Sequence, residues 1–380
     1  MGKVRPRHHD SAHMPQIMPS PPRSAEVTDV PAETRATQQI NSTGVPDMRT
    51  WISRLAAIAA VILLAGMAHA QQFMMKLSSP TVNDAPHEWM KAFKAGVEQR
   101  SGGRIKVLIY PASQLGQIPA TVEGVAMGTI EFVIPVSGFL AGLEPRFQVV
   151  DAAGLFDSVE HGQKVFNDSE IRARIAKWGE TKGVETLLLA LNGPLMLVSH
   201  KPVHTAADLK GQKIRVPGAT PLYIEPFKKL GVSPISMPLG EVLPAMQNRT
   251  IDGMIASFNV LTAFKYYDVA KTATYLPGHF LVVGGVINSK FLKSLGPELE
   301  AIVREEARKA ETVFSTYGVE DVERTRQTWV KNGGEAITMT PAEAKAYLDT
   351  VTSVASQIMA GNPTMKADYD AFLAAAKKYR

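Results

Sequence analysis

Residues 223–256 read YIEPFKKLGVSPISMPLGEVLPAMQNRTIDGMIA. The apolar residues of this stretch change twice from helical spacing to a short continuous run. The pattern predicts helix, strand, helix and strand over Tyr223–Leu230, Val232–Met237, Glu241–Asn248 and Thr250–Ala256. Alternation of this kind is typical of α/β proteins whose sheets are largely parallel.

The same alternation is present nearer the N-terminus. A helix, a strand, a helix and a strand are expected over Asn83–Gly103, Ile105–Tyr110, Ala120–Met127 and Thr129–Val136. The segment Val122–Ile134 (VEGVAMGTIEFVI) also echoes Leu243–Ile255 (LPAMQNRTIDGMI). Two α/β units of similar construction would produce this echo, and chance agreement at a few positions is the alternative.

A long helix is expected in the C-terminal part of the chain. Residues from Pro297 to about Gly333 are rich in Ala, Glu and Arg. A helix of about 36 residues would be ~54 Å long, which is enough to contact two domains. The length of 380 residues also favours more than one domain.

The composition excludes several classes of function. The chain contains no Cys, so it has no disulfides, thiolate metal sites, Cys nucleophiles or lipidated cysteine. Its 41 basic and 36 acidic residues interleave without a basic stripe, so no nucleic-acid partner is expected. Nucleotide-binding, zinc-protease and serine-hydrolase motifs are absent. We therefore expect no enzyme activity, no cofactor and no metal site.

The N-terminal 70 residues are expected to lie outside the fold. Residues 1–47 are rich in Pro, Ser and Arg, and they are interpreted as disordered or as an extension that is not part of the true protein. Residues 48–70 read as a signal peptide, with two arginines, an apolar run over Leu55–Met67 and a cleavage site after Ala70. A membrane anchor is the alternative. The mature, exported protein would begin at Gln71.

The stretch DLKGQKIRVP at 208–217 contains Arg215, a candidate ligand-binding residue. Residues Lys213–Val216 are expected to form a strand that delivers this side chain to an edge or a cleft. The planar guanidinium of Arg can bind a carboxylate through two parallel hydrogen bonds. Without further information, a solvated strand residue paired with a neighbouring acid is the favoured alternative.

Several segments, in the right order, resemble the DctP-type substrate-binding proteins of TRAP (tripartite ATP-independent periplasmic) transporters. They are SGGRIKVLIYPASQLG at 101–116, DLKGQKIRVPG at 208–218, LGVSPISMPLGEVLPAMQNRTIDGMIA at 230–256, FKYYDVAKTATYLPGH at 264–279 and VINSKFLKSLGPELEAIVREEA at 286–307. The resemblance implies an α/β fold of the two-domain periplasmic binding protein type (type II-like), with a cleft, a hinge and a long domain-spanning helix.

The resemblance also implies domain boundaries and a role. Domain I would comprise residues 74–193 plus 282–320, and domain II residues 194–281 plus 321–380. The protein would be the periplasmic substrate-binding component of a TRAP transporter. It would be monomeric, capture a small organic acid in the cleft and deliver it to the small and large membrane subunits.

The resemblance matches Arg215 to the family arginine that pairs with a substrate carboxylate. It therefore favours a carboxylate-binding Arg215 over the solvated, acid-paired arginine described above. The other positions expected to contact substrate are Asn83, His87, Gln114, Ser137, Asn192, Tyr223, Leu239 and Asn259.

Two departures from the family pattern bear on the substrate. Leu195 and Met196 stand where many acid-binding members carry a second basic residue, and residues 254–257 read Met-Ile-Ala-Ser where other members read Gln-Glu-Asn-Pro. Both changes replace polar groups with mainly apolar ones. They predict a monocarboxylate with an apolar or aromatic body, rather than a dicarboxylate or sialic acid.

Two alternatives to transport remain. The first is a ligand-binding partner of a periplasmic sensor, which would share the fold. The second is a secreted hydrolase, because a catalytic triad can be assembled from distant segments without a local motif.

Overall fold

The computed structural model describes residues 73–380, and the predictions for 1–47, 48–70 and the cleavage site lie outside these residues. The strands are β1 (Phe73–Ser78), β2 (Ile105–Tyr110), β3 (Phe132–Val133), β4 (Val184–Ser199), β5 (Lys213–Val216), β6 (Ser233–Ser236), β7 (Gly253–Ser257), β8 (Thr272–Asn288) and β9 (Glu335–Ile337). The longer helices are α2 (Ala85–Arg100), α3 (Ile118–Met127), α5 (Val159–Asn167), α7 (Pro221–Lys229), α8 (Leu239–Gln247), α11 (Gly296–Lys331), α12 (Pro341–Ala360) and α13 (Pro363–Tyr379). Shorter helices are α4 (Ser137–Leu140), α6 (Ser169–Ile175), α9 (Phe258–Ala263) and α10 (Ser289–Ser294), with 3₁₀ turns η1 (Pro145–Asp151), η2 (Glu180–Lys182), η3 (Ala206–Leu209) and η4 (Tyr266–Asp268).

The strands form one sheet in the order β2-β1-β3-β8-β4-β7-β5-β6, with β9 beside β8. The two ends of the sheet correspond: at each end, the first strand of a set of three lies between the second strand, at the edge, and the third strand, next to the central pair. We call β2, β1 and β3 the first half-sheet, and β6, β5 and β7 the second half-sheet. Pairing is parallel within each half-sheet. The predicted echo has a structural basis, because α3 leads into β3 and α8 leads into β7, at equivalent places in the two halves.

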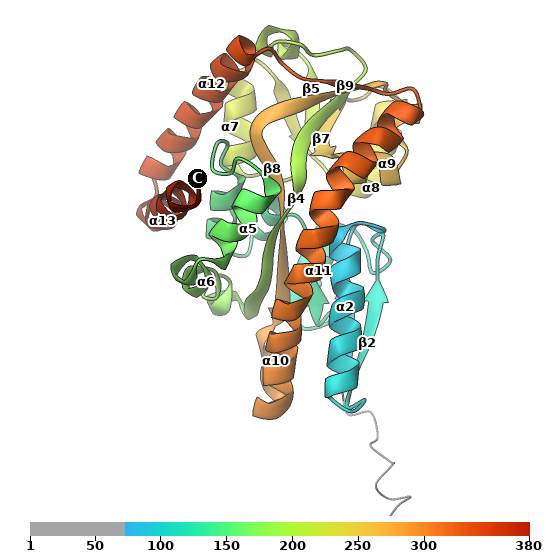
Figure 1. The fold of residues 1–380 in the computed structure, drawn as a ribbon, viewed down its shortest axis with the longest axis vertical. Helices are drawn as coiled ribbons and strands as arrows, with labels where there is room; N and C mark the ends of the chain where they lie inside the picture. Colours follow the sequence, from blue (N-terminus) through green and yellow to red (C-terminus); the bar gives the residue numbers. More distant parts are fainter. Residues whose placement is uncertain (1–72) are drawn as a thin grey trace, which may run out of the picture. The chain divides into compact units, whose positions relative to one another are not determined.

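The central strands differ from the largely parallel sheet that was predicted. β4 and β8 are antiparallel to each other, and β8 is also antiparallel to β3 as β4 is to β7. These two long strands run through both halves of the sheet (Figure 1). Their register shifts on both sides of Pro194, which pairs with Phe280. Local periodicity cannot report such long-range pairing, so the sequence pattern predicted β2, β5, β6 and β7 but not the central pair.

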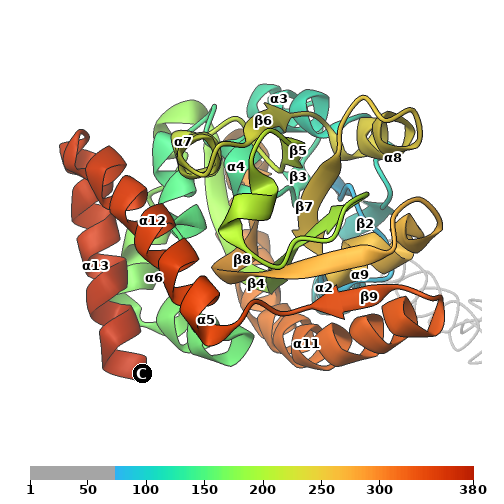
Figure 2. The same cartoon turned by 90° about the horizontal axis from the view of Figure 1, so that it is seen from above.

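The helix α11 is a single helix of 36 residues, as predicted, and it contacts two cores. Its N-terminal part packs on α2, where Phe314 joins the hydrophobic cluster of Trp89 and Phe93, whose rings stack 4.8 Å apart. Its C-terminal part places Trp329 in the other cluster, 6.0 Å from the ring of Phe258. Figure 2 shows α11 on one side of β4 and β8, with α12 and α13 on another side.

Most element bounds agree with the sequence predictions to within a few residues, and β3 is the clear exception. The expected strand over Thr129–Val136 is reduced to Phe132–Val133. Gly128 ends α3 in the left-handed conformation, and the amide N–H groups of Thr129 and Ile130 donate to Gly124 instead of entering the ladder. Only an isolated bridge from Val136 to Val283 extends the pairing.

Candidate functional site

A small cavity of about 30 Å³ lies between the two half-sheets, near the carboxyl ends of their parallel strands. Ligand sites of open α/β sheets are commonly found at this edge. Its walls come from Pro80, Thr81, Ile118, Ile134, Val136, Asn192, Arg215, Pro217, Leu239, Ile255, Ala256, Val260, Leu281 and Val283. Only three of these residues, Thr81, Asn192 and Arg215, have polar side chains. The wall therefore combines one cation with a mostly apolar surface.

Arg215 is the charged group of this cavity. The side chain is 2% exposed, its Nε donates to the carbonyl of Met237 (3.1 Å) and its Nη1 to the carbonyl of Ile255 (3.3 Å). No Asp or Glu of residues 73–380 forms an ion pair with it. The alternative of a solvated arginine paired with an acid is therefore wrong. Burial lowers the pKa of Arg215 to about 10, so the group stays protonated at neutral pH.

The arrangement of Arg215 defines what it can bind. The two carbonyls fix the guanidinium plane, and hydrogen atoms on Nη1 and Nη2 remain free of partners within the described part of the chain. A buried cation without a counter-ion is costly, and an anionic ligand would compensate for that cost. The site is chemically suited to an anionic group such as a carboxylate.

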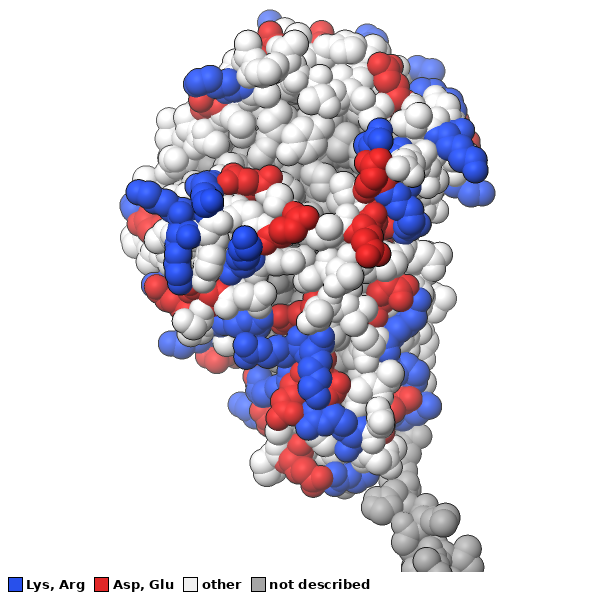
Figure 3. Space-filling view, in the orientation of Figure 1, with Lys and Arg blue, Asp and Glu red and all other residues white. Residues whose placement is uncertain are grey.

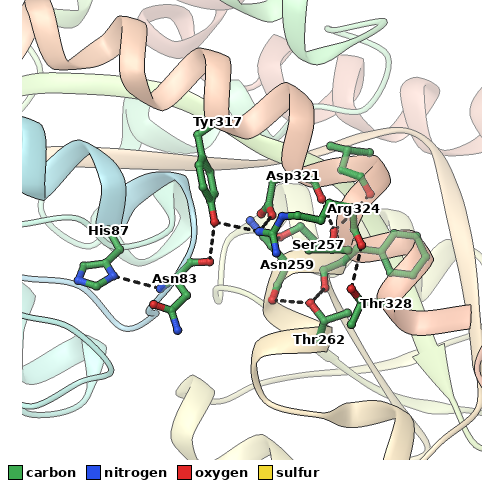
Figure 4. Close-up of polar contacts among 12 residues, drawn as sticks. Asn83, His87, Ser257, Asn259, Thr262, Tyr317, Asp321, Arg324 and Thr328 are labelled. Carbon is green, nitrogen blue, oxygen red and sulfur yellow. Dashed lines mark hydrogen bonds and ion pairs between the residues drawn. The ribbon is translucent and has the colours of Figure 1, made fainter. Parts of the chain in front are cut away.

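Asn192 lies in the cavity wall, on β4, and Asn259 of α9 holds it in place. The Nδ2 of Asn259 donates to the Oδ1 of Asn192 at 3.1 Å, and both residues are less than a tenth exposed. Both also line a smaller adjoining hollow together with Asp321 of α11. Figure 4 shows Asn259 and Ser257 close to Asp321 and Arg324.

Asn83, just before α2, is linked to α11, whereas His87 contacts Asn83; neither residue is in the cavity wall. Asn83 adopts a left-handed conformation (φ 58°), and its amide N–H donates to the Nδ1 of His87 at 3.1 Å. Its carbonyl accepts from the Tyr317 hydroxyl at 3.2 Å, and that hydroxyl in turn accepts from Arg324 at 2.9 Å (Figure 4). The pKa of His87 is lowered, chiefly by burial.

The remaining candidates lie in three different places. Leu239, at the start of α8, is in the cavity wall. Gln114 is exposed in the turn after β2 and is not in the wall. Ser137 and Tyr223 are buried together around Asp151: the Ser137 hydroxyl donates to the Asp151 Oδ1 at 2.5 Å, and the Tyr223 hydroxyl donates to the same oxygen at 3.3 Å.

Asp151 was not predicted from the sequence, although a lone acid in the apolar run FQVVDAAGLF was a usable signal. It is 4% exposed, and its Oδ2 has no hydrogen-bond partner in the described structure. Burial raises its pKa to about 8. A second buried carboxyl, Asp84 at the start of α2, has its pKa raised by burial to about 6.

Residues 73–380 show neither a cluster of metal ligands nor a membrane-spanning helix. No group of three or more metal-binding side chains comes together in that range. None of the helices described is both long enough and apolar enough to span a bilayer. On the face drawn in Figure 3, acidic and basic side chains are interspersed, in agreement with their interleaving in the sequence.

Together, the sheet with its two corresponding half-sheets, the helix across both cores and the cavity between the half-sheets define a two-domain α/β periplasmic binding protein. Residues 78–362 match the family described as bacterial extracellular solute-binding protein, family 7 (DctP). The chain belongs to this family, whose members are periplasmic proteins that bind small solutes.

Named relatives cover most of the chain. The 2,3-diketo-L-gulonate-binding periplasmic protein YiaO of Escherichia coli (strain K12) is 29% identical over 305 residues, which are 78% of this chain and 92% of that protein. The C4-dicarboxylate-binding periplasmic protein DctP of Shewanella loihica is 23% identical over 308 residues, which are 80% of this chain and 91% of that protein.

Solved structures share the fold. A TRAP periplasmic solute-binding protein from Anaerococcus prevotii, with bound D-glucuronate, has a TM-score of 0.76 and 24% identity, and the match covers 81% of this chain and 99% of that chain. One from Shewanella oneidensis, with bound succinate, has a TM-score of 0.75 and 24% identity, and the match covers 80% and 99%.

Proposed function

We propose that this protein is the periplasmic substrate-binding component of a TRAP transporter and that its substrate is a small monocarboxylate with an apolar body. One observation carries the substrate class: Arg215 is a buried, uncompensated cation in an otherwise mostly apolar wall. A second carboxylate would meet no second cation among the wall residues, so dicarboxylates should bind less well.

In the bound state, the carboxylate accepts hydrogen bonds from the free Nη1 and Nη2 hydrogens of Arg215. Asn192 of β4, held by Asn259, offers a further polar contact. The apolar body packs against aliphatic wall residues such as Ile134, Leu239 and Val260. A buried arginine–carboxylate pair fixes orientation, and loss of one partner typically costs about 2–5 kcal/mol.

Binding is coupled to closing of two domains in this proposal. We place domain I at residues 74–193 plus 282–320 and domain II at 194–281 plus 321–380. The chain passes from one of these domains to the other near Pro194 on β4, near Phe280 on β8, and within α11. The register shifts around Pro194 support a hinge at the strand crossings, because irregular pairing bends more readily than a regular ladder.

The protein is proposed to be exported by the segment 48–70, to act as a monomer and to present its closed form to the small and large membrane subunits. Relatives bind small organic acids, and members of the family are solute-binding transport proteins, which supports a role without catalysis. A periplasmic sensor partner is the second candidate, since it would use the same cavity.

A thermal-shift screen tests the substrate class. The purified protein is heated with apolar monocarboxylates such as isovalerate and benzoate, with succinate, and with galacturonate. A ligand at 100 times its dissociation constant should stabilise the protein by about 2.7 kcal/mol. Stabilisation by succinate alone would reject the monocarboxylate assignment. Stabilisation by galacturonate, a hydroxylated monocarboxylate, with none by isovalerate or benzoate would reject the apolar body. Turnover of any of these acids, followed by chromatography, would argue for an enzyme.

A further inference from the structure

The carboxyl group of Asp151 lies where the two walls of the cleft meet. Ser137 and Asp151 belong to the segment that follows β3, whereas Tyr223 belongs to α7, which follows β5. The hydrogen bond from the Tyr223 hydroxyl to Asp151 therefore crosses from one half of the molecule to the other. Asp151 is buried in this arrangement, with Oδ2 unpaired.

Next to this contact, the backbone segments of the two walls also approach each other closely. A Cβ atom added to Gly138 would lie 2.9 Å from the carbonyl oxygen of Pro217, and one added to Gly218 would lie 2.9 Å from the Cα of Gly138. Only glycine allows the two segments to approach so closely. The structure is therefore closed at this point, and separating the two walls would break the Tyr223–Asp151 bond and expose the carboxyl group.

The other ionisable groups around η1 face elsewhere. On α13, Asp368 accepts from Arg174 and from the indole of Trp178. On β8, the ring of His279 packs on Phe227 and Tyr347.

The remaining charged residues on the elements packed against η1 also form no hydrogen bond or ion pair with Asp151. Arg146 of η1 pairs with Glu144, the α7 residues Glu225 and Lys228 form an exposed pair, and α4 has no ionisable side chain. The Tyr223 hydroxyl is the one ionisable group of residues 73–380 that hydrogen-bonds to the Asp151 carboxyl.

We propose that Asp151, Ser137 and Tyr223 form a proton-linked latch, in which closing of the cleft transfers one proton from solvent to the Asp151 carboxylate and opening returns it. The proposal rests on the domain closing that the proposed function requires. In the open form, water solvates the carboxylate, which is ionised at neutral pH. In the closed form, the group is neutral, with the proton on Oδ2 and Oδ1 accepting from Ser137 and Tyr223.

The direction of the pH effect follows from this exchange. The carboxyl pKa is about 8 in the closed form and takes the ordinary value for Asp in the open form. Between these two values the ratio of closed to open molecules should fall up to tenfold for each rise of one pH unit, and above about pH 8 it should level off.

Pulsed electron paramagnetic resonance on the ligand-free protein tests the latch. The chain has no Cys, so nitroxide labels can be attached at Glu123→Cys on α3 and Lys229→Cys on α7, which are exposed positions on the two sides. Distances are measured from pH 5.5 to 9. We expect the short, closed distance to lose population as the pH rises to about 8, and the Asp151→Asn variant to show no such pH dependence. Asp370→Asn, an exposed acid on α13, is the matched control and should behave as the wild type.

Two results would overturn the proposal: a distance distribution in the wild type that does not change with pH, or an Asp151→Asn variant that responds to pH as the wild type does. The Tyr223→Phe variant keeps the proposal testable if Asp151→Asn fails to fold. It should reduce the closed-to-open ratio at pH 5.5 at least threefold, and an unchanged ratio would count against the latch. Because no ligand is present, failure here is distinct from failure of the substrate screen.

Discussion

Arg215 on β5 is fixed by the backbone of Ile255 on β7: its Nη1 donates to the Ile255 carbonyl at 3.3 Å. The strand that neighbours the arginine thus sets the direction of its guanidinium. Nη2 takes no part in this contact, which leaves it free to meet a ligand in the cavity.

Replacement of Arg215 tests the carboxylate anchor. Arg215→Met should weaken binding of the monocarboxylate found by the screen by about 2–5 kcal/mol, or roughly 30-fold to several-thousand-fold. Arg215→Lys should weaken it clearly but less, because Lys offers a point charge and not a planar fork. Calorimetry on folded variants measures both, with the exposed Arg326→Met as the control. Binding by Arg215→Met within threefold of wild type would place the anchor elsewhere.

Removal of the amide that holds Asn192 should have a smaller effect. Asn259→Ala leaves the Asn192 side chain without its 3.1 Å donor, so the wall loses a fixed polar group. A lost hydrogen bond of this kind costs about 1 kcal/mol, so we expect affinity to fall about fivefold. The same calorimetry detects this change. An unaltered affinity would show that Asn192 does not depend on Asn259 for binding.

The close approach of Gly138 gives a direct test of closing. Gly138→Ala places a methyl group 2.9 Å from the Pro217 oxygen, so the cleft should no longer close fully. Small-angle scattering should show that the wild type becomes more compact at ligand saturation and that Gly138→Ala does so less. Gly142→Ala is a matched control, because nothing lies within 4 Å of its added Cβ. Equal compaction in both variants would contradict the expectation.

His279 should make the fold sensitive to acid. The His279 ring is 2% exposed, and neither of its nitrogens has a hydrogen-bond partner in the part of the chain described. Burial lowers its pKa to about 4. Since the unfolded chain takes up the proton first, stability should fall as the pH drops from about 6.5 to 4, by on the order of 3 kcal/mol.

Chemical denaturation at several pH values measures this loss. The His279→Leu variant should lack this part of the acid sensitivity, whereas the exposed His204→Leu should retain it. A pH profile for His279→Leu identical to that of the wild type would assign the sensitivity to other groups.

The sequence predicted the strands β2, β5, β6 and β7, the helices α2, α3, α7 and α8, and α11 well, because Gly and Pro mark the ends and the apolar spacing within each element is regular. Strand Ile105–Tyr110 and strand Lys213–Val216 have the predicted bounds. The β4–β8 pairing was not predictable in this way, since both faces of these strands are buried and no alternation remains.

The residues of the candidate site were likewise predictable from the sequence only in part. Arg215 could be singled out by its residue type and its strand, but its burial depends on Met237 and Ile255, which are distant in the sequence. Asp151 stands out as a lone acid in an apolar run, but its role could not be assigned, because its partners Ser137 and Tyr223 come from separate elements. Contacts between distant segments create the electrostatic properties of the site, and local patterns do not contain them.

The two central strands have a consequence for how the protein can be divided. Because β3 pairs with β8 and β7 pairs with β4, each half-sheet is completed by a strand that also serves the other half. A cut between the halves would leave long unpaired strand edges, which are prone to aggregate. The halves are therefore not exchangeable modules: they should melt in one cooperative transition, and fragments of either half should not fold alone.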